Sequence, residues 1–230
     1  MVFETGMTEE CRLYGMIIPF SLVRTGGKVV IHAFPWAMEL AGQVDALAKE
    51  KPEWLFSDSF YTYIGERLEP LVKKRGYLPD EGYCRQFARV FRIEELSQLR
   101  REVILPETGE IHWDDGFSCR TETELDENYR DCPLFGVVRD GELLSFANVN
   151  HDDGEVADIG VETAPEAVGK GYASSNVAAL TAFLLEKGRC VTYISLSDNP
   201  GSARVAEKAG FAPHALEYNY VCFLETDEAV

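Results

Sequence analysis

Two glycines separated by one residue form a turn that is suited to binding an anion. Gly169 and Gly171 flank Lys170, after an apolar strand-like segment and at the start of a run that is typical of a helix. Glycine allows a tightly curled backbone whose N–H groups point to one side, and the first N–H groups of a helix have no acceptor within it. These donors and the positive end of the helix dipole favour an anion. The sequence therefore predicts a phosphate site at residues 168–173.

Three carboxylates in or beside the preceding strand-like segment could act as a general base. Side chains alternate between the two faces of a strand, so Asp158 and Glu162 share one face and Glu155 lies on the other. A carboxylate beside a bound ammonium group can take its proton, either directly or through a water molecule. Each of the three could equally be a solvated or structurally paired carboxylate.

A dinucleotide-binding turn is the main alternative interpretation of these glycines. That motif requires the spacing G-x-G-x-x-G between a strand and a helix, within a unit of parallel strands. Here Ser174 occupies the position of the third glycine, and the segments before the turn predict antiparallel strands. The sequence therefore favours a different kind of phosphate site.

The segments around the turn predict antiparallel strands covered by helices. Asp140 and Gly141 join two apolar runs and are a strong hairpin signal, and a second turn at 151–154 leads into the strand that contains Asp158. After the glycine turn, apolar residues at helical spacing predict a helix as far as Lys187. The expected order then continues with a strand over 190–196, a helix over 202–210 that is capped at Asn199, and a strand over 211–224.

The first part of the chain is expected to alternate strands and helices. The patterns predict a hairpin over 11–35, helices over 36–50 and 60–76, a strand within 83–92 and a short charged helix over 94–101. Residues 106–133 are rich in acids and turn formers, which indicates a linker or a loop beside a substrate. We therefore expect two domains, an N-terminal α/β domain over 1–105 and a second domain over 106–230.

The charge of the chain argues against some partners and favours others. The net charge is −17, and most of the acidic excess lies in residues 111–230. Nucleic acids and anionic membranes are bound by lysine and arginine, so we expect neither as a partner. An acidic field attracts cations, which favours a small amine as substrate, although a surface that only keeps the protein in solution explains the charge as well.

Cysteine spacing and hydropathy point to a cytoplasmic protein without a metal. The six cysteines show no C-x-x-C spacing, so neither a zinc site nor a disulfide framework is indicated. No apolar run approaches the roughly 20 residues that span a bilayer, and the first residues are acidic where a signal peptide would be basic. We expect a cytoplasmic chain, and association into a homodimer is left open.

The order of the elements and their motifs resemble the GNAT superfamily of N-acetyltransferases over roughly residues 132–225. In that family the turn reads Arg/Gln-x-x-Gly-x-Gly/Ala. Gly171 and Ala173 match its last two positions, while Val168 stands in place of the Arg or Gln. Because the family holds the pyrophosphate mainly through backbone N–H groups, the valine removes one side-chain contact and leaves those donors intact.

The closing helix carries the second part of the resemblance. Asn199, Ser202 and the ending Glu-Lys-Ala-Gly-Phe at 207–211 match the family pattern. A tyrosine that often serves there as general acid would fall at Ala206 and is missing. The candidates for that acid are Tyr218 and Tyr220 on the last strand, Tyr193, or a water molecule, although a place in the core explains these tyrosines equally well.

The resemblance implies an acyl-CoA N-acyltransferase fold and acetyl-CoA as the cofactor. The fold class is α+β, with a mixed, mostly antiparallel sheet flanked by helices and an extra N-terminal α/β domain. A faint echo of residues 54–77 in 194–211 suggests that this extra domain is a degenerate half-acetyltransferase, although chance similarity explains the echo as well.

The same resemblance assigns roles to individual residues. Family members commonly carry an acid at the position of Asp158, which makes it the first choice for the base, followed by Glu162 and Glu155. The backbone near Val161 is expected to polarise the thioester carbonyl. The residues expected to bind the cofactor are Gly160, Val161, Glu162, Thr163, Gly169, Lys170, Gly171, Tyr172, Ala173, Ser174, Asn199 and Ser202.

The function implied is direct transfer of an acetyl group from acetyl-CoA to the primary amine of a small cationic molecule, with a carboxylate as general base. Two alternatives remain open. One is acetylation of protein N-termini or lysines. The other is a catalytically weak module that binds coenzyme A for regulation. The missing Arg or Gln at Val168 and the missing tyrosine at Ala206 would suit such a module.

Overall fold

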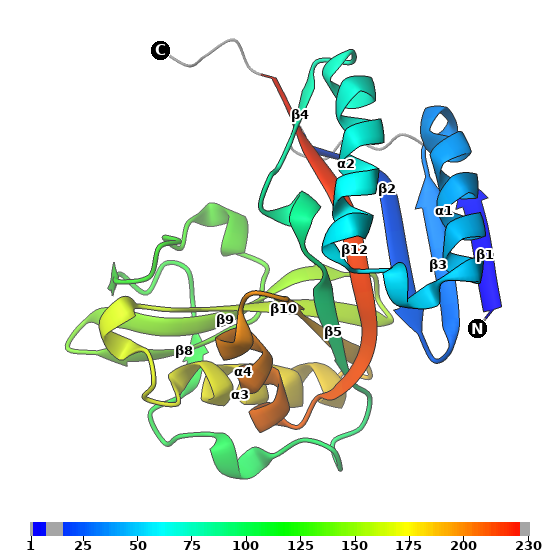
Figure 1. The fold of residues 1–230 in the computed structure, drawn as a ribbon. Coiled ribbons are helices and arrows are strands. Elements are labelled where there is room, and N and C mark those ends of the chain that lie inside the picture. The colour runs from blue at the N-terminus through cyan, green and yellow to red at the C-terminus, as the bar shows by residue number, and fades with distance from the viewer. Residues whose placement is uncertain (1, 8–15, 226–230) are drawn as a thin grey trace. The chain divides into compact units, whose positions relative to one another are not determined.

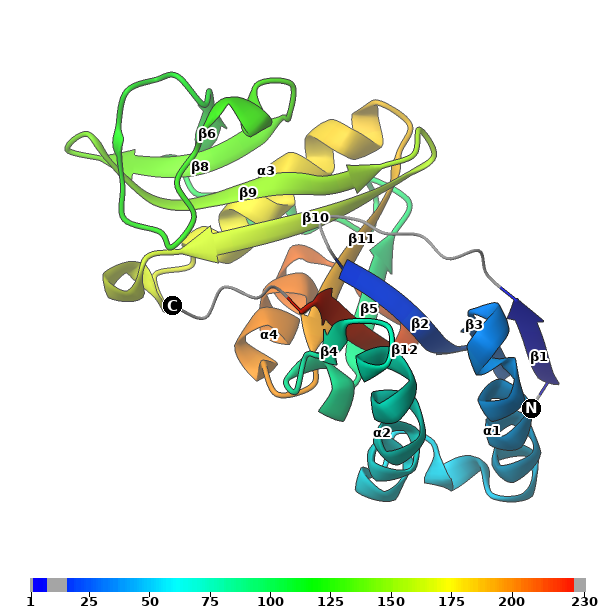
Figure 2. The same ribbon diagram turned by 90° about the horizontal axis from the view of Figure 1, so that it is seen from above.

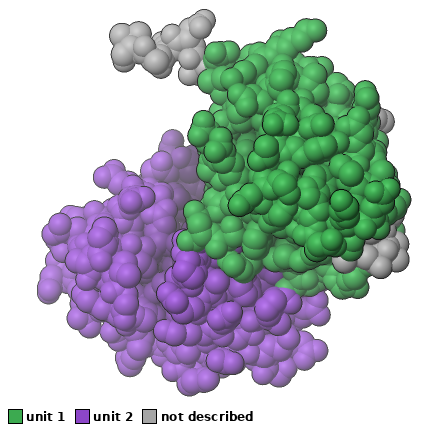
Figure 3. Space-filling view, in the orientation of Figure 1, with its two compact units in different colours: residues 1–89, 196–198, 214–230 green, residues 90–195, 199–213 purple. Residues whose placement is uncertain are grey.

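The chain forms two compact units, and each is described here by itself (Figure 3). The computed structural model describes residues 2–7 and 16–225. The first unit comprises residues 1–89, 196–198 and 214–230, and the second comprises 90–195 and 199–213. The division between the units therefore does not fall at residue 105, where the sequence predicted a domain boundary. Residues 90–105 belong to the second unit and the last strand belongs mainly to the first, because strand pairing joins segments that are distant in sequence.

The first unit is built on a sheet of four strands in the order β1, β3, β2, β12, with β4 attached to β12. The strands are β1 (Val2–Met7), β2 (Met16–Thr25), β3 (Lys28–Ala33), β4 (Tyr77–Pro79) and β12 (Ala212–Leu224). β2 and β3 form the predicted hairpin around Gly26 and Gly27, whose φ angles of 52° and 85° suit glycine. Residues 11–15 of that prediction lie outside the described residues.

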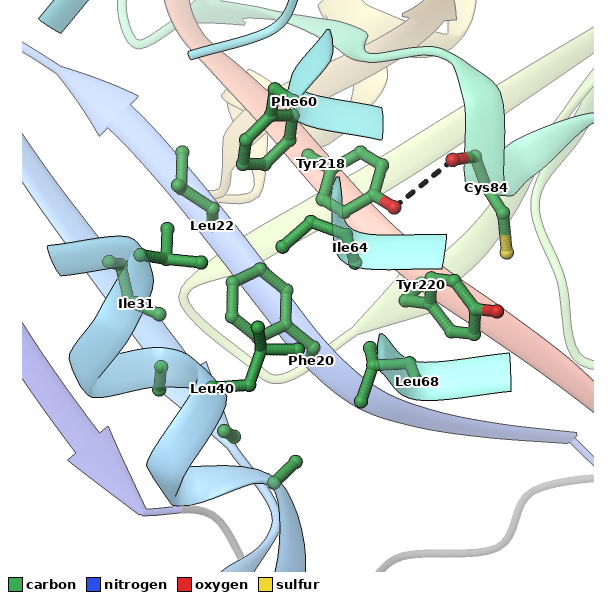
Figure 4. Packing of buried hydrophobic residues seen from close by; sticks show 14 of the residues in the cluster. Phe20, Leu22, Ile31, Leu40, Phe60, Ile64, Leu68, Cys84, Tyr218 and Tyr220 are labelled. Atoms are coloured by element: carbon green, nitrogen blue, oxygen red, sulfur yellow. Dashed lines mark hydrogen bonds between the residues drawn. The ribbon is translucent and has the colours of Figure 1, made fainter. Parts of the chain in front are cut away.

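Two helices cover one face of this sheet, as Figures 1 and 2 show. They are α1 (Met38–Glu50) and α2 (Asp58–Lys73), and α2 begins where the Ser57 hydroxyl accepts a hydrogen bond from the N–H of Phe60. Apolar side chains of the sheet and of both helices form one core (Figure 4). Its members include Phe20, Leu22, Ile31, Leu40, Phe60, Ile64, Leu68, Tyr218 and Tyr220.

The second unit contains the predicted antiparallel meander. Its strands are β5 (Ala88–Ile93), β6 (Gly109–Ile111), β7 (Ser118–Cys119), β8 (Leu134–Arg139), β9 (Glu142–Asp152), β10 (Val156–Thr163) and β11 (Cys190–Leu196). They lie in the order β5, β11, β10, β9, β8, β6, and β7 pairs with β9. The hairpin between β8 and β9 turns at Asp140 and Gly141, whose φ angles of 53° and 80° are those the Asp-Gly signal predicts. The α+β fold class expected from the sequence is confirmed.

Helices α3 (Tyr172–Glu186) and α4 (Pro200–Ala209) pack beside each other in the second unit. Val177, Leu180 and Leu184 of α3 are buried, as their spacing predicts. No helix among the described residues is long and apolar enough to cross a membrane.

The short helix predicted over 94–101 does not form. The side-chain oxygen of Gln98 accepts hydrogen bonds from the N–H groups of Glu94 and Glu95, at 3.0 and 2.9 Å. The N–H of Arg100 donates to the carbonyl of Ala209 at the end of α4, at 3.0 Å. The Gln98 bonds are local, whereas the bond from Arg100 to Ala209 is tertiary and replaces the i to i−4 bond that a helix over 94–101 would have made, which a local charge pattern cannot reveal.

Candidate active site

Strand β10 separates from β11 halfway along its length. The parallel pairing of the two strands runs from Val156 to Ile159, which lies opposite Tyr193, whereas the pairing of β10 with β9 continues to Thr163. The edge of Gly160–Thr163 that faces away from β9 is therefore not paired with β11. Unpaired backbone groups on a strand edge can bind an extended ligand as if it were another strand.

A cavity of about 420 Å³ lies next to this opening. It is lined by side chains and backbone from β10, the glycine turn, the start of α3, β11 and α4. The lining residues are Val161, Thr163, Ala167, Val168, Gly169, Gly171, Tyr172, Ala173, Ser174, Tyr193, Asn199, Gly201, Ser202, Arg204, Val205 and Lys208. Nine of the twelve residues expected to bind the cofactor are in this set, while Gly160, Glu162 and Lys170 are not.

The glycine turn presents unpaired donors to the cavity. Gly169 and Gly171 have φ angles of 83° and 88°, which side chains other than glycine rarely adopt. The first bond of α3 runs from the N–H of Ser175 to the carbonyl of Gly171, so the three preceding N–H groups have no acceptor within the helix. No side chain caps this end of the helix and its first turn has no acid.

The side chain of Val168 takes no part in this arrangement of donors. It is 69% exposed, so the donors at this turn are backbone N–H groups at the positive end of the dipole of a helix of 15 residues. The backbone donors that the sequence predicted are therefore present without an arginine or glutamine at this position.

Two basic side chains reach the cavity from α4, and the sequence interpretation had missed both. Arg204 and Lys208 are four residues apart and so share one face of the helix. Both are exposed, and no carboxylate in the described part of the chain pairs with either. Two cations at helical spacing, within an otherwise acidic half of the chain, were the signal that could have identified them.

Tyr193 and Ser202 form a polar pair in the wall of the cavity. The hydroxyl of Tyr193 lies 2.9 Å from that of Ser202, and the N–H of Ser202 donates to the side chain of Asn199, which caps α4. Burial raises the pKa of Tyr193, the bond to Ser202 lowers it, and the charge of Asp158 raises it again. The net shift is upward, so the hydroxyl keeps its proton at neutral pH and can donate it.

Asp158 belongs to a polar strip on β9, β10 and β11. Its carboxylate accepts hydrogen bonds from Asn150 at 3.3 Å and from the hydroxyl of Thr192 at 3.2 Å. Asn148 in turn donates to Asn150 at 2.9 Å. A Cβ atom at Gly160 would lie 2.9 Å from the side chain of Asn150, so the glycine lets the amides lie close to β10. Asp158 is half-buried and is not among the residues that line the cavity. By strand alternation its side chain lies on the face of β10 opposite to that of Val161 and Thr163, which do line it.

The other two carboxylates lie in different surroundings. Glu162 accepts hydrogen bonds from the N–H of Thr123, at 3.0 Å, and from its hydroxyl, so its carboxylate holds the loop before β8. Glu155 is exposed in the turn before β10, and its own N–H donates to Asp153. Glu155 is six residues from Val161, or roughly 20 Å along a strand.

Tyr218 is part of the core of the first unit. It is fully buried among aromatic rings, and its hydroxyl donates to the carbonyl of Cys84 at 3.0 Å (Figure 4). Burial raises its pKa well above the ordinary value. Of the tyrosines considered as general acid, Tyr193 is the one that lines the cavity.

Comparison with known families agrees with the fold of the second unit. Residues 105–211 match the model of the Acetyltransferase (GNAT) family. No curated protein matches the chain by sequence.

Solved structures resemble the chain at low sequence identity. A GNAT-family protein of Novosphingobium aromaticivorans superposes with a TM-score of 0.51 at 18% identity, over 66% of this chain and 69% of that one. A Drosophila protein superposes with a TM-score of 0.51 at 15% identity, over 70% of this chain and 58% of that one. A smaller match, with a TM-score of 0.33 and 17% identity, is to yncA of Salmonella typhimurium, whose structure holds its cofactor acetyl-CoA; it covers 43% of this chain and 68% of that one.

Proposed function

We propose that this chain moves the acetyl group of acetyl-CoA to the primary amine of a small cationic molecule, because residues 105–211 match the model of the Acetyltransferase (GNAT) family, whose cofactor is acetyl-CoA. The single observation that carries the proposal is the opening of β10 from β11 beside the donors of the glycine turn. An extended arm with a phosphate at one end and a thioester at the other suits these two features together.

The binding of the cofactor is distributed over three elements. The N–H groups at the start of α3 hold the pyrophosphate, and Arg204 and Lys208 add positive charge for its phosphates. The free edge of Gly160–Thr163 pairs with the pantetheine arm, and an N–H near Val161 polarises the thioester carbonyl. Removing one donor of this kind typically costs about 10²–10³ in rate.

The transfer itself needs a base and an acid. Asp158 takes a proton from the ammonium group, directly or through water, and later releases it to solvent. The neutral amine nitrogen then bonds to the carbonyl carbon, and as the carbon–sulfur bond breaks the nitrogen loses a second proton to water. Tyr193 gives its proton to the departing sulfur and is then reprotonated from solvent. Its place in the cavity wall and its raised pKa support this role.

Binding is the first step to test. Acetyl-CoA at about 100 times its Kd adds about 2.7 kcal/mol of stability, which is roughly 5–10 °C in Tm for a chain of this size. Absence of any shift would overturn the proposal. Release of free thiol with a panel of amines then tests transfer, and a protein that binds but releases no thiol is a coenzyme A-binding module instead.

The base is tested with a matched pair of substitutions. Asp158→Asn should lower kcat by about 10²–10⁴ and leave the Kd of acetyl-CoA unchanged. Asp140→Asn removes the same charge from an exposed turn and should leave both unchanged. Equal rates in the two variants would rule out Asp158 as the base.

A further inference from the structure

A second cavity, of about 410 Å³, lies wholly within the first unit and outside the residues that match the family. It lies between α2, residues 79–85 and β12. Its lining residues are Asp58, Tyr61, Thr62, Gly65, Glu66, Glu69, Pro79, Glu81, Cys84, Arg85 and Tyr220. Its volume is within the usual range of small-molecule sites, about 300–1,000 Å³.

Two tyrosine side chains in the lining of this cavity are at least nine-tenths buried, and their hydroxyls have no hydrogen-bond partner among the described residues. Tyr61 is 9% exposed and Tyr220 is 1% exposed. The neighbouring Tyr218 is paired, since it donates to the carbonyl of Cys84 (Figure 4). Burial raises the pKa of Tyr61 to about 12 and raises that of Tyr220, so both hydroxyls are neutral and can accept a hydrogen bond.

The cavity is bordered by more negative than positive charge. Asp58, Glu66 and Glu69 lie along one face of α2, and Glu81 faces them from the following loop. Arg85 is the only basic side chain in the lining as described. Glu69 is bonded to Lys73 at 2.6 Å and Glu66 lies 3.7 Å from Arg67, so both acids also have basic neighbours on the outer surface of the helix.

The carboxylates are spread along the cavity and do not converge. Within the described part of the chain, no three Asp, Glu, His or Cys side chains are placed to hold a metal ion. Charges spaced along a helix, with aromatic rings between them, suit an elongated organic cation better than a compact divalent ion. Ammonium groups can bind carboxylates, and methylene groups can lie against the tyrosine rings.

Gly65 leaves the cavity open where a side chain could have filled it. It lies in the middle of α2, where glycine costs about 0.5–1 kcal/mol relative to alanine. A Cβ atom there would meet nothing within 4 Å, and its φ is not in the left-handed region, so neither packing nor backbone geometry requires a glycine. The missing side chain gives a ligand room between Tyr61 and Glu69.

We propose that this cavity binds an alkyl diamine or polyamine. The ammonium groups of the ligand bind the carboxylates of α2 and Glu81, and their N–H groups donate hydrogen bonds to the hydroxyls of Tyr61 and Tyr220. This site is separate from the acetyl-CoA cavity and does not depend on acetyl transfer. It gives the first unit a binding function of its own.

The test uses the full chain without acetyl-CoA and titrates 1,5-diaminopentane by calorimetry. Gly65→Leu places a good helix former in the cavity and should lower the affinity at least about tenfold, the loss expected from one charged hydrogen bond. Gly42→Leu is the matched control, since Gly42 is also a helix glycine whose Cβ would meet nothing within 4 Å, and it lies on α1 outside the cavity. It should bind as the wild type does. Helix content measured by circular dichroism should be the same in both variants.

Three results would overturn the proposal. They are no binding to the wild type, equal binding to the two leucine variants, and displacement of the diamine by stoichiometric Mg²⁺. Glu69→Gln should also weaken binding, whereas the neutral analogue 1,5-pentanediol should not compete. Any amine bound at the acceptor site of the acetyltransferase domain survives Gly65→Leu, so failure of this proposal is distinguishable from failure of the proposed function.

Discussion

Gly171→Ala perturbs the candidate cofactor site through the backbone alone. The φ of Gly171 is 88°, and an added Cβ would meet only Leu105, at 3.9 Å, which is an ordinary contact. The cost is therefore that of a left-handed alanine, about 1–2 kcal/mol. We expect the free protein to relieve this strain by reshaping the turn. Binding must then restore the strained turn, so the affinity for acetyl-CoA falls about 5- to 30-fold.

Gly188→Ala is the matched control at the other end of α3. Gly188 has a φ of 78° and nothing within 4 Å of an added Cβ, so its backbone cost is similar. It does not line the cavity. Thermal unfolding should show similar losses of Tm in the two variants, roughly 2–8 °C. Calorimetry with acetyl-CoA should show weaker binding only for Gly171→Ala. Equal affinities in the two variants would refute the assignment of the turn as the phosphate site.

Two further predictions concern the general acid and the dependence of stability on pH. Tyr193→Phe should lower kcat for thiol release by about 10²–10⁴. Tyr218→Phe should keep kcat and lower Tm, because it leaves the Cys84 carbonyl unpaired. The reverse pattern would reject Tyr193 as the acid. Asp152 accepts hydrogen bonds from the N–H of Gly154 and from Arg189, which hold the pKa of its carboxyl below the ordinary value. The ionised Asp152 carboxylate therefore stabilises the fold above the unfolded pKa of about 3.9, and this stabilisation is lost as the pH falls through the lower folded pKa. Asp152→Asn should thus lower Tm at pH 7, and its Tm should differ less from that of the wild type toward pH 2. A difference in Tm that is independent of pH would contradict this.

Most of the second unit could be predicted because its signals are local. Asp140 and Gly141 turn a hairpin by their own backbone preferences, and Gly171 and Asn199 start helices through bonds to residues a few positions away. The sequence could not predict interactions with partners that are distant along the chain. The N–H of Arg100, within the helix predicted over 94–101, donates to Ala209 at the end of α4, and the carboxylate of Glu162 accepts hydrogen bonds from Thr123.

The meander, the glycine turn and the capped helices follow from local patterns, because hydrophobic period and turn chemistry act over a few residues. Three features of the site appear only in the folded chain: β10 leaves β11 after Ile159, Arg204 and Lys208 reach the same cavity as the turn, and Tyr193 lines it while Tyr218 does not. Local patterns cannot predict them because strand pairing and side-chain burial are set by contacts between segments far apart in the chain. The second cavity, with its unpaired tyrosines and its open Gly65, is likewise a product of such contacts.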